Sequence, residues 1–186
     1  MRKRLVITAA ALAAAALALP SATAATTPVL DGKKVKTLTL KATSTAQDND
    51  ADLVALSGPE RVDCEAPRCV KLPFVYKPAK GVKGGLAFAI SWTLPVSDMD
   101  LYVAQLGKDG NAEIASCGSS AGTSEKVYLE PGSLRPGKTY ALIVDFYRTP
   151  GEAVTGSVTF PGTNQVASDV PSSVEDGAGL PINCGL

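Results

Sequence analysis

Alternation of apolar and polar residues recurs along the chain and predicts β-strands. The clearest example lies at 86–93, where Leu86, Phe88, Ile90 and Trp92 alternate with smaller or polar residues. Because successive side chains of a strand point to opposite faces, these four share one face, and Trp92 is predicted to be a buried anchor. Similar, in part shorter, patterns predict seven further strands at 35–42, 70–76, 99–104, 112–117, 126–129, 140–147 and 157–160.

These strands predict an all-β fold, a two-sheet β-sandwich or jelly-roll-like domain of about eight strands. The 17 Gly and 13 Pro fit a chain rich in turns, and no sustained helical periodicity follows the first 24 residues. We expect one domain over 25–160. Residues 161–186 are rich in Gly, Ser and Pro and are predicted to form a C-terminal extension.

Residues 1–24 have the pattern of a cleaved export signal. Arg2, Lys3 and Arg4 precede an apolar run over 5–19, and a small-residue cleavage site ends at Ala24. The run is shorter than the roughly 20 residues that span a bilayer. The sequence therefore predicts a secreted, extracellular protein with no membrane anchor in its mature form.

Charge and composition exclude several functions. Without the three basic residues of the signal, 15 basic residues face 18 acidic ones, a net charge of −3 that argues against nucleic acid and anionic membranes as partners. The chain has no histidine, which excludes Ser-His-Asp and Cys-His catalytic sites and histidine-ligated zinc. Asp98 and Asp100 are more typical of strand-end carboxylates than of a glycosidase pair. We expect no catalytic activity and no required cofactor.

Four cysteines, Cys64, Cys69, Cys117 and Cys184, predict two disulfides in an exported chain. The turn around Pro67 favours a local Cys64–Cys69 bridge, which leaves Cys117 with Cys184 to tether the C-terminal extension. The other two connectivities remain open. A four-cysteine zinc site is disfavoured because paired C-x2-C spacing is absent.

Two groups of carboxylates are candidate calcium sites. Asp98 and Asp100 share one face at a strand end, and Glu125 heads a second strand that could approach them. Ca²⁺ takes about six to eight oxygen ligands and tolerates irregular geometry, which suits carboxylates that converge from a turn. The second candidate consists of alternate carboxylates in one polar loop, namely Asp48, Asp50 and Asp52.

The stretch from Trp92 to Phe160, together with the two residues before it, contains a series of recognisable segments. They are Ile90-Ser91-Trp92, Asp98-Met99-Asp100-Leu101-Tyr102-Val103, Ser124-Glu125-Lys126-Val127, Pro131-Gly132, the strand 137–144 and the closing strand 156–160. Their order resembles the bacterial pre-peptidase C-terminal domain, whose D-x-D-L-Y-V strand the second segment matches. The resemblance implies a jelly-roll-like β-sandwich of the kind often appended to secreted peptidases.

Tyr102 and Tyr147 fall on the faces opposite the core phase of their strands and are the best candidates for an exposed binding surface. We therefore expect a secreted, non-catalytic binding or accessory module for an extracellular protein or polysaccharide. One alternative is a protease inhibitor that presents Glu65-Ala66-Pro67-Arg68 within the Cys64–Cys69 loop. The other is a structural domain that assists secretion or folding.

Overall fold

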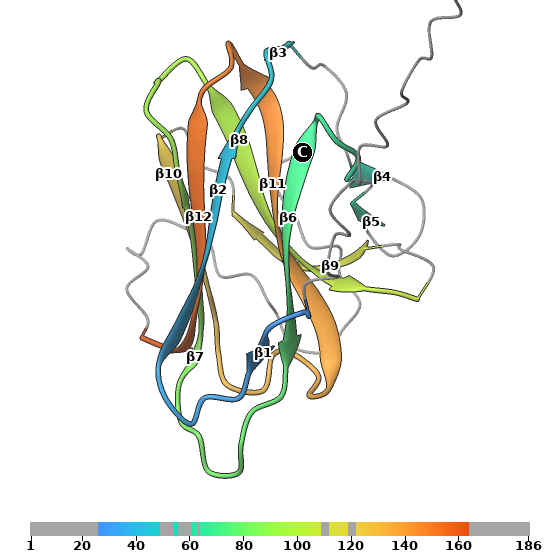
Figure 1. Cartoon of the computed structure of the whole chain (residues 1–186), viewed down its shortest axis with the longest axis vertical. Coiled ribbons are helices and arrows are strands. Elements are labelled where there is room, and N and C mark those ends of the chain that lie inside the picture. The colour runs from blue at the N-terminus through green and yellow to red at the C-terminus, as the bar shows by residue number, and fades with distance from the viewer. Residues whose placement is uncertain are drawn as a thin grey trace, which may run out of the picture.

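The computed structural model describes residues 26–48, 54–55, 61–62, 64–108, 112–118 and 122–163. Within these ranges all regular structure is β, arranged in two sheets (Figure 1), so the predicted all-β class is confirmed. No helix in the described part of the chain has the length and hydropathy to cross a membrane. The predicted export signal and nearly all of the C-terminal extension, from 164 onward, lie outside these ranges.

The smaller sheet has four antiparallel strands in the order β10-β7-β12-β2. Their bounds are Ser124–Leu129 for β10, Gly85–Ser91 for β7, Ala153–Gly162 for β12 and Lys36–Thr43 for β2. In this sheet β2, which comes first along the chain, therefore pairs with β12, the last of the described strands.

The larger sheet has the order β1-β6-β11-β8-β9-β5-β4, with β3 also paired to β11. The long strands are β6 (Cys69–Tyr76), β11 (Lys138–Thr149), β8 (Asp98–Leu106) and β9 (Ala112–Gly118). The short strands are β1 (Val29–Leu30), β3 (Gln47–Asp48), β4 (Val54–Ala55) and β5 (Arg61–Val62). All pairs are antiparallel except β1 with β6.

All eight strands that the alternation predicts are present. The four additional strands, β1, β3, β4 and β5, have two residues each, which is too short for any periodicity to register. Strands β4 and β5 lie between the predicted strands at 35–42 and 70–76, where the alternation predicts none.

The main core lies between the two sheets. Its aromatic residues pack closely, with ring centroids 6.0 Å apart for Phe74 and Phe88 and 5.3 Å apart for Tyr76 and Phe160. Trp92 is only 7% exposed, which confirms the prediction that its strand phase buries it.

A second, smaller apolar cluster covers the outer face of the larger sheet. It consists of Val62, Cys64, Cys69, Tyr102, Ala104, Ala112, Ile114, Ala141 and Ile143. Tyr102 faces away from the main core, as its phase indicates, but it is only 4% exposed. The expectation that Tyr102 lies on an exposed surface is therefore wrong, because this cluster buries the face to which it belongs. Tyr147 is half-buried.

The loops gather at two opposite ends of the sandwich (Figure 1). We call the end formed by residues 44–46, 92–97 and 150–152 the apical end; it lies at the top of the figure. We call the end formed by residues 31–36, 77–84 and 130–138 the basal end, at the bottom.

Candidate functional site

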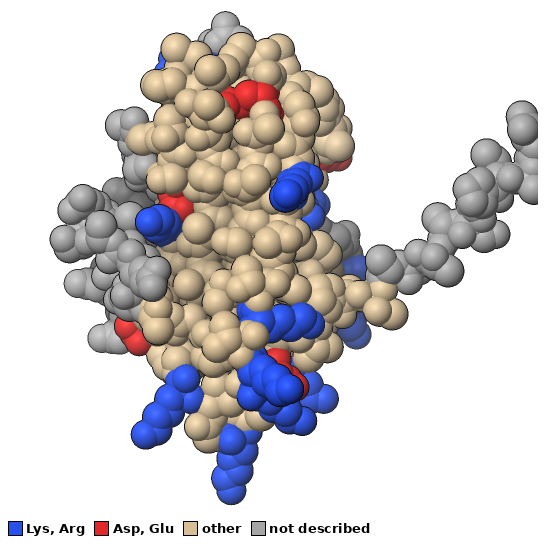
Figure 2. All heavy atoms as spheres, turned by 60° about the vertical axis from the view of Figure 1, so that its left-hand side comes forward, with Lys and Arg blue, Asp and Glu red and all other residues tan. Residues whose placement is uncertain are grey.

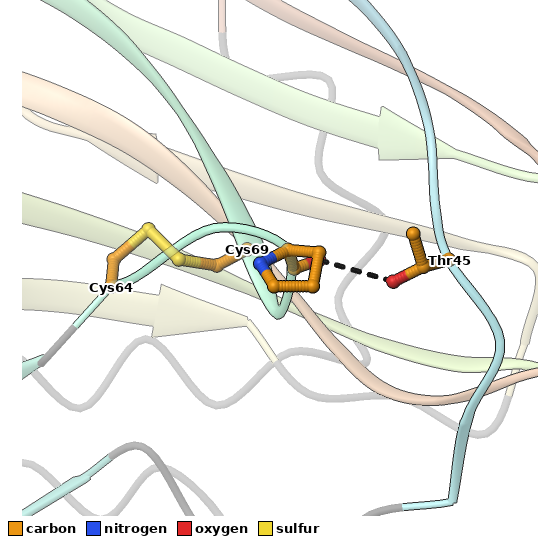
Figure 3. Close-up of a disulfide and its surroundings, with 4 residues drawn as sticks. Thr45, Cys64 and Cys69 are labelled. Atoms are coloured by element: carbon orange, nitrogen blue, oxygen red, sulfur yellow. Dashed lines mark hydrogen bonds between the residues drawn. A yellow bond between two sulfur atoms is a disulfide. The ribbon is translucent and has the colours of Figure 1, made fainter.

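The Cys64–Cys69 disulfide is present, with the two Cα atoms 5.6 Å apart, as the sequence predicted. Figure 3 shows the bridge beside Thr45, whose hydroxyl donates a hydrogen bond to the carbonyl oxygen of Pro67 at 3.5 Å. Cys117 is also disulfide-bonded. Its expected partner, Cys184, lies outside the described residues, so that pairing stays a prediction.

The loop inside this bridge is not shaped like a protease-binding segment. The Arg68 N–H donates to the Glu65 carbonyl oxygen at 3.0 Å, which closes a turn, and the Phe146 N–H donates to the Arg68 carbonyl oxygen at 2.9 Å. The Nε atom of Arg68 is buried. Proteases bind their substrates and inhibitors through extended backbone, so this geometry does not favour the inhibitor hypothesis at Glu65–Arg68.

Replacing both cysteines of this bridge, Cys64→Ala with Cys69→Ala, is expected to lower the free energy of unfolding by about 2 kcal/mol. The bridge closes a short loop, so little chain entropy is removed from the unfolded state. Denaturant titration of the wild type and the double variant measures this difference. A loss of about 4 kcal/mol or more, typical of a long closed loop, would contradict the loop-length argument.

The first candidate calcium site is not assembled. Glu125 is 2% exposed, and its Oε2 atom accepts a hydrogen bond from the Leu101 N–H at 2.7 Å. Met99 and Leu101 face the main core, so Asp98 and Asp100 face the opposite side of β8. Among the described residues no three cysteine or carboxylate side chains come together as metal ligands. The predicted convergence of Asp98, Asp100 and Glu125 is therefore wrong.

Sequence reasoning missed the carboxylate that does approach Asp100. Asp145 of β11 lies directly opposite Asp100 in the register of the two strands, and it is buried. The Asp100 and Asp145 side chains both have interaction partners. For the second candidate calcium site, Asp50, Asp52 and the side chain of Asp48 lie outside what the structure describes, so that site stays a prediction.

The apical end presents an exposed apolar turn. The Ser97 N–H donates to the Leu94 carbonyl oxygen at 3.0 Å, which closes a β-turn with Pro95 at its second position. Val96 is 65% exposed and Leu94 is 38% exposed. We call Thr93–Val96 the apical loop. It places two of the four exposed large aliphatic side chains of the described residues next to each other.

The Glu152 carboxylate holds this loop in place through hydrogen bonds, and we call it the brace. Its Oε2 atom accepts hydrogen bonds from the N–H groups of Thr93 at 2.8 Å and Leu94 at 3.0 Å. Its Oε1 atom accepts a hydrogen bond from the Ser97 hydroxyl. Burial raises the pKa of Glu152, but these hydrogen bonds lower it by more, so the pKa lies below its ordinary value of 4.5. The brace is therefore a carboxylate anion at neutral pH.

Further hydrogen bonds fix the brace to the sandwich. Ser44 donates through its N–H and its hydroxyl to the Glu152 carbonyl oxygen, at 2.8 and 3.1 Å, and its Oγ atom accepts from the Glu152 N–H at 2.9 Å. The Trp92 indole N–H donates to the Ser97 carbonyl oxygen at 3.2 Å. The apical loop is thus held by strands β2, β7 and β12 together.

Part of this arrangement had a signal in the sequence. Leu94 and Val96 are apolar residues in a proline turn between two strands, a position where exposed polar residues are the norm. The role of Glu152 had none, because its partners lie 55 to 59 residues earlier in the chain. Only the fold brings them together.

A shallow hollow of about 400 Å³ lies on the outer face of the smaller sheet. It is lined mostly by small and hydroxyl-bearing side chains, including Thr39, Ala89 and Ser91, and none of the described residues that line it has an aromatic ring. Two hydroxyl pairs on this face bind each other, Thr37 with Thr159 at 2.9 Å and Ser91 with Thr155 at 2.8 Å. The described lining of the hollow therefore offers no ring on which a sugar could stack.

No family model and no curated protein matches this chain. Among solved structures, a mitogen derived from Yersinia pseudotuberculosis is similar at a TM-score of 0.36 and 14% identity, over 74% of this chain and 95% of that one. The Aeromonas hydrophila protein PliG, a periplasmic inhibitor of g-type lysozyme, is similar at a TM-score of 0.33 and 17% identity, over 72% of this chain and 91% of that one. The resemblance to the pre-peptidase C-terminal domain stays a prediction.

Proposed function

We propose that this chain is an exported, non-catalytic module that binds an extracellular protein through its apical loop. The observation that carries the proposal is the pair of exposed aliphatic side chains, Leu94 and Val96, on a turn that Glu152 holds rigid. The Cys64–Cys69 disulfide supports export, because such bridges persist in oxidising compartments.

Rigidity favours binding because an ordered loop loses little conformational entropy when a partner covers it. Full burial of an aliphatic side chain such as Leu94 or Val96 contributes about 1.5–3 kcal/mol. The segment Thr93–Val96 has no aromatic ring and no charge, so it suits an apolar pocket of a protein better than a polysaccharide chain.

The chemistry of the brace supports a non-catalytic role. A general acid must hold a proton near neutral pH, and Glu152 has its pKa shifted in the opposite direction. Both of its carboxylate oxygens are occupied by donors of the chain itself. Glu152 therefore orders the loop and is not a catalytic residue.

The test begins with capture of partners from extracellular proteins on the immobilised chain and their identification by mass spectrometry. The affinity of each purified partner is then measured by calorimetry for the wild type and for Leu94→Asp with Val96→Asp. We expect the double variant to bind at least about 100-fold more weakly, since two buried aliphatic contacts are lost. Its melting temperature should fall only slightly, because Val96 is 65% exposed and Leu94 is 38% exposed.

Val35→Asp is the matched control, because Val35 is an equally aliphatic side chain, 70% exposed, at the opposite end of the sandwich. The control should bind the partner like the wild type. Affinities of the double variant within about threefold of the wild type would contradict the proposal. The proposal would also be contradicted if the chain bound insoluble polysaccharide and the Leu94→Asp, Val96→Asp double variant bound it equally well.

A further inference from the structure

The basal end carries a dense cluster of positive charge. Its three segments, 31–36, 77–84 and 130–138, contain eight basic residues and only two acidic ones, Asp31 and Glu130. All eight basic side chains are exposed; they are Lys33, Lys34, Lys36, Lys77, Lys80, Lys83, Arg135 and Lys138. Figure 2 shows Lys and Arg gathered at the lower end of the molecule and pointing outward.

Strand pairing brings these segments together. Lys138, the first residue of β11, lies opposite Tyr76, the last residue of β6, and Lys36, the first residue of β2, lies opposite Phe160 near the end of β12. The Ala79 N–H donates to the Asp31 carbonyl oxygen at 2.8 Å, which joins two of the three segments. The cluster is therefore a fixed feature of the fold.

The cluster also has a tightly packed base. Gly32 has a φ of +69°, and a Cβ atom placed there would lie 2.5 Å from the Phe160 ring. Only glycine fits this position, so the chain between β1 and β2 is held against the main core. This contact presents Lys33, Lys34 and the 70%-exposed Val35 at the outer surface.

Like charges at this density repel one another, and an anionic partner relieves that repulsion. Seven of the eight basic residues are lysines, which act as point charges, and the three segments contain no aromatic residue that could stack on a base or a sugar. The side chains project from a convex end (Figure 2), which suits contact with a broad surface. Val35 adds an aliphatic side chain in the middle of the charges.

We propose that the basal end docks on the surface of an anionic lipid bilayer, with the lysines over the headgroups and Val35 at the interface. The net charge of −3 led to the opposite expectation, because a net charge says nothing about where the charges lie. Since the apical loop lies at the other end of the sandwich, it points away from the membrane and stays free for its partner.

The test is co-sedimentation of the protein, purified after export, with vesicles of phosphatidylcholine alone or with about one-third phosphatidylglycerol. We expect binding only to the anionic vesicles, and loss of that binding when salt rises from about 0.1 M to about 0.5 M. Each lysine near an anionic surface contributes about fivefold in affinity. Lys33→Glu with Lys34→Glu, and separately Lys77→Glu with Lys80→Glu, should therefore weaken binding by at least about 25-fold.

The matched control is Lys41→Glu with Lys126→Glu, which reverses the same number of exposed lysines on the outer face of the smaller sheet. It should bind anionic vesicles within about threefold of the wild type. Val35→Asp should weaken vesicle binding, whereas Val96→Asp should not.

Three outcomes would overturn the proposal. They are an absence of binding to anionic vesicles, equal losses for the basal variants and the control, and binding of duplex DNA or dextran sulfate without binding of vesicles. Vesicle binding and partner binding are separate measurements, and Val35→Asp and Val96→Asp are each expected to affect only one of them, so failure of one proposal leaves the result for the other interpretable.

Discussion

Trp92→Ala is expected to lower the free energy of unfolding by about 3–5 kcal/mol, the range for removal of a large buried aromatic side chain. Trp92 is 7% exposed in the main core, and its indole N–H binds the Ser97 carbonyl oxygen below the apical loop. The substitution therefore leaves a cavity and releases one support of the loop. Chemical denaturation followed by circular dichroism measures the loss.

Trp92→Phe is the matched control, because it keeps an aromatic ring and removes the indole N–H. It should cost clearly less than Trp92→Ala. Trp92 is the only tryptophan in the chain, so native fluorescence reports on this site alone. Emission typical of a water-exposed indole, or a loss below about 1 kcal/mol for the alanine variant, would contradict the buried position.

Glu152→Gln is expected to lower the free energy of unfolding at neutral pH by about 3 kcal/mol. The amide replaces a carboxylate that accepts from Thr93, Leu94 and Ser97, and hydrogen bonds to a charged group contribute about 1.5–3 kcal/mol each. The NH2 group of the glutamine also replaces one acceptor oxygen, so that it faces a hydrogen-bond donor of the loop. Thermal and denaturant unfolding measure the loss, and Glu130→Gln, an exposed carboxylate at the basal end, should show none.

The same substitution has a pH signature. The pKa of Glu152 in the folded state lies below its ordinary value of 4.5, so its contribution to stability is fully present above that value and is lost as pH falls through the folded-state pKa. The difference between wild type and Glu152→Gln should therefore be constant near neutral pH and shrink on acidification below about pH 4.5. A difference that grows in acid would show that the carboxylate is not stabilised in the folded state.

The sheets could be predicted because one face of each strand has a regular apolar pattern. In β7, Leu86, Phe88 and Ile90 define the inner face without ambiguity, and the structure has them buried there. The same reasoning placed Tyr102 on the correct face but at the surface. Ala141 and Ile143, on the opposite face of β11 from the main core, were the available signal that a second apolar layer covers the larger sheet.

The candidate site was not predicted from the sequence, although part of it has a signal there. Leu94 and Val96 are visible in the sequence as apolar residues in a turn, whereas Glu152 reads as an ordinary polar residue after Pro150 and Gly151. Glu152 binds the apical loop, which connects β7 to β8, whereas Glu152 itself lies between β11 and β12. The basal charge likewise comes from three segments that lie far apart in the sequence, so neither net charge nor a local run of charges reveals it.

The pairing of β2 with β12 has a consequence for when the protein can fold. Thr37 and Thr159 bind each other across these strands although 122 residues separate them. The smaller sheet cannot close until nearly the whole domain has been synthesised, and contacts of such long range form slowly. The two-sheet sandwich therefore cannot be complete while the chain is still being made, and in an exported chain, as proposed above, it would close only after the chain has crossed the membrane.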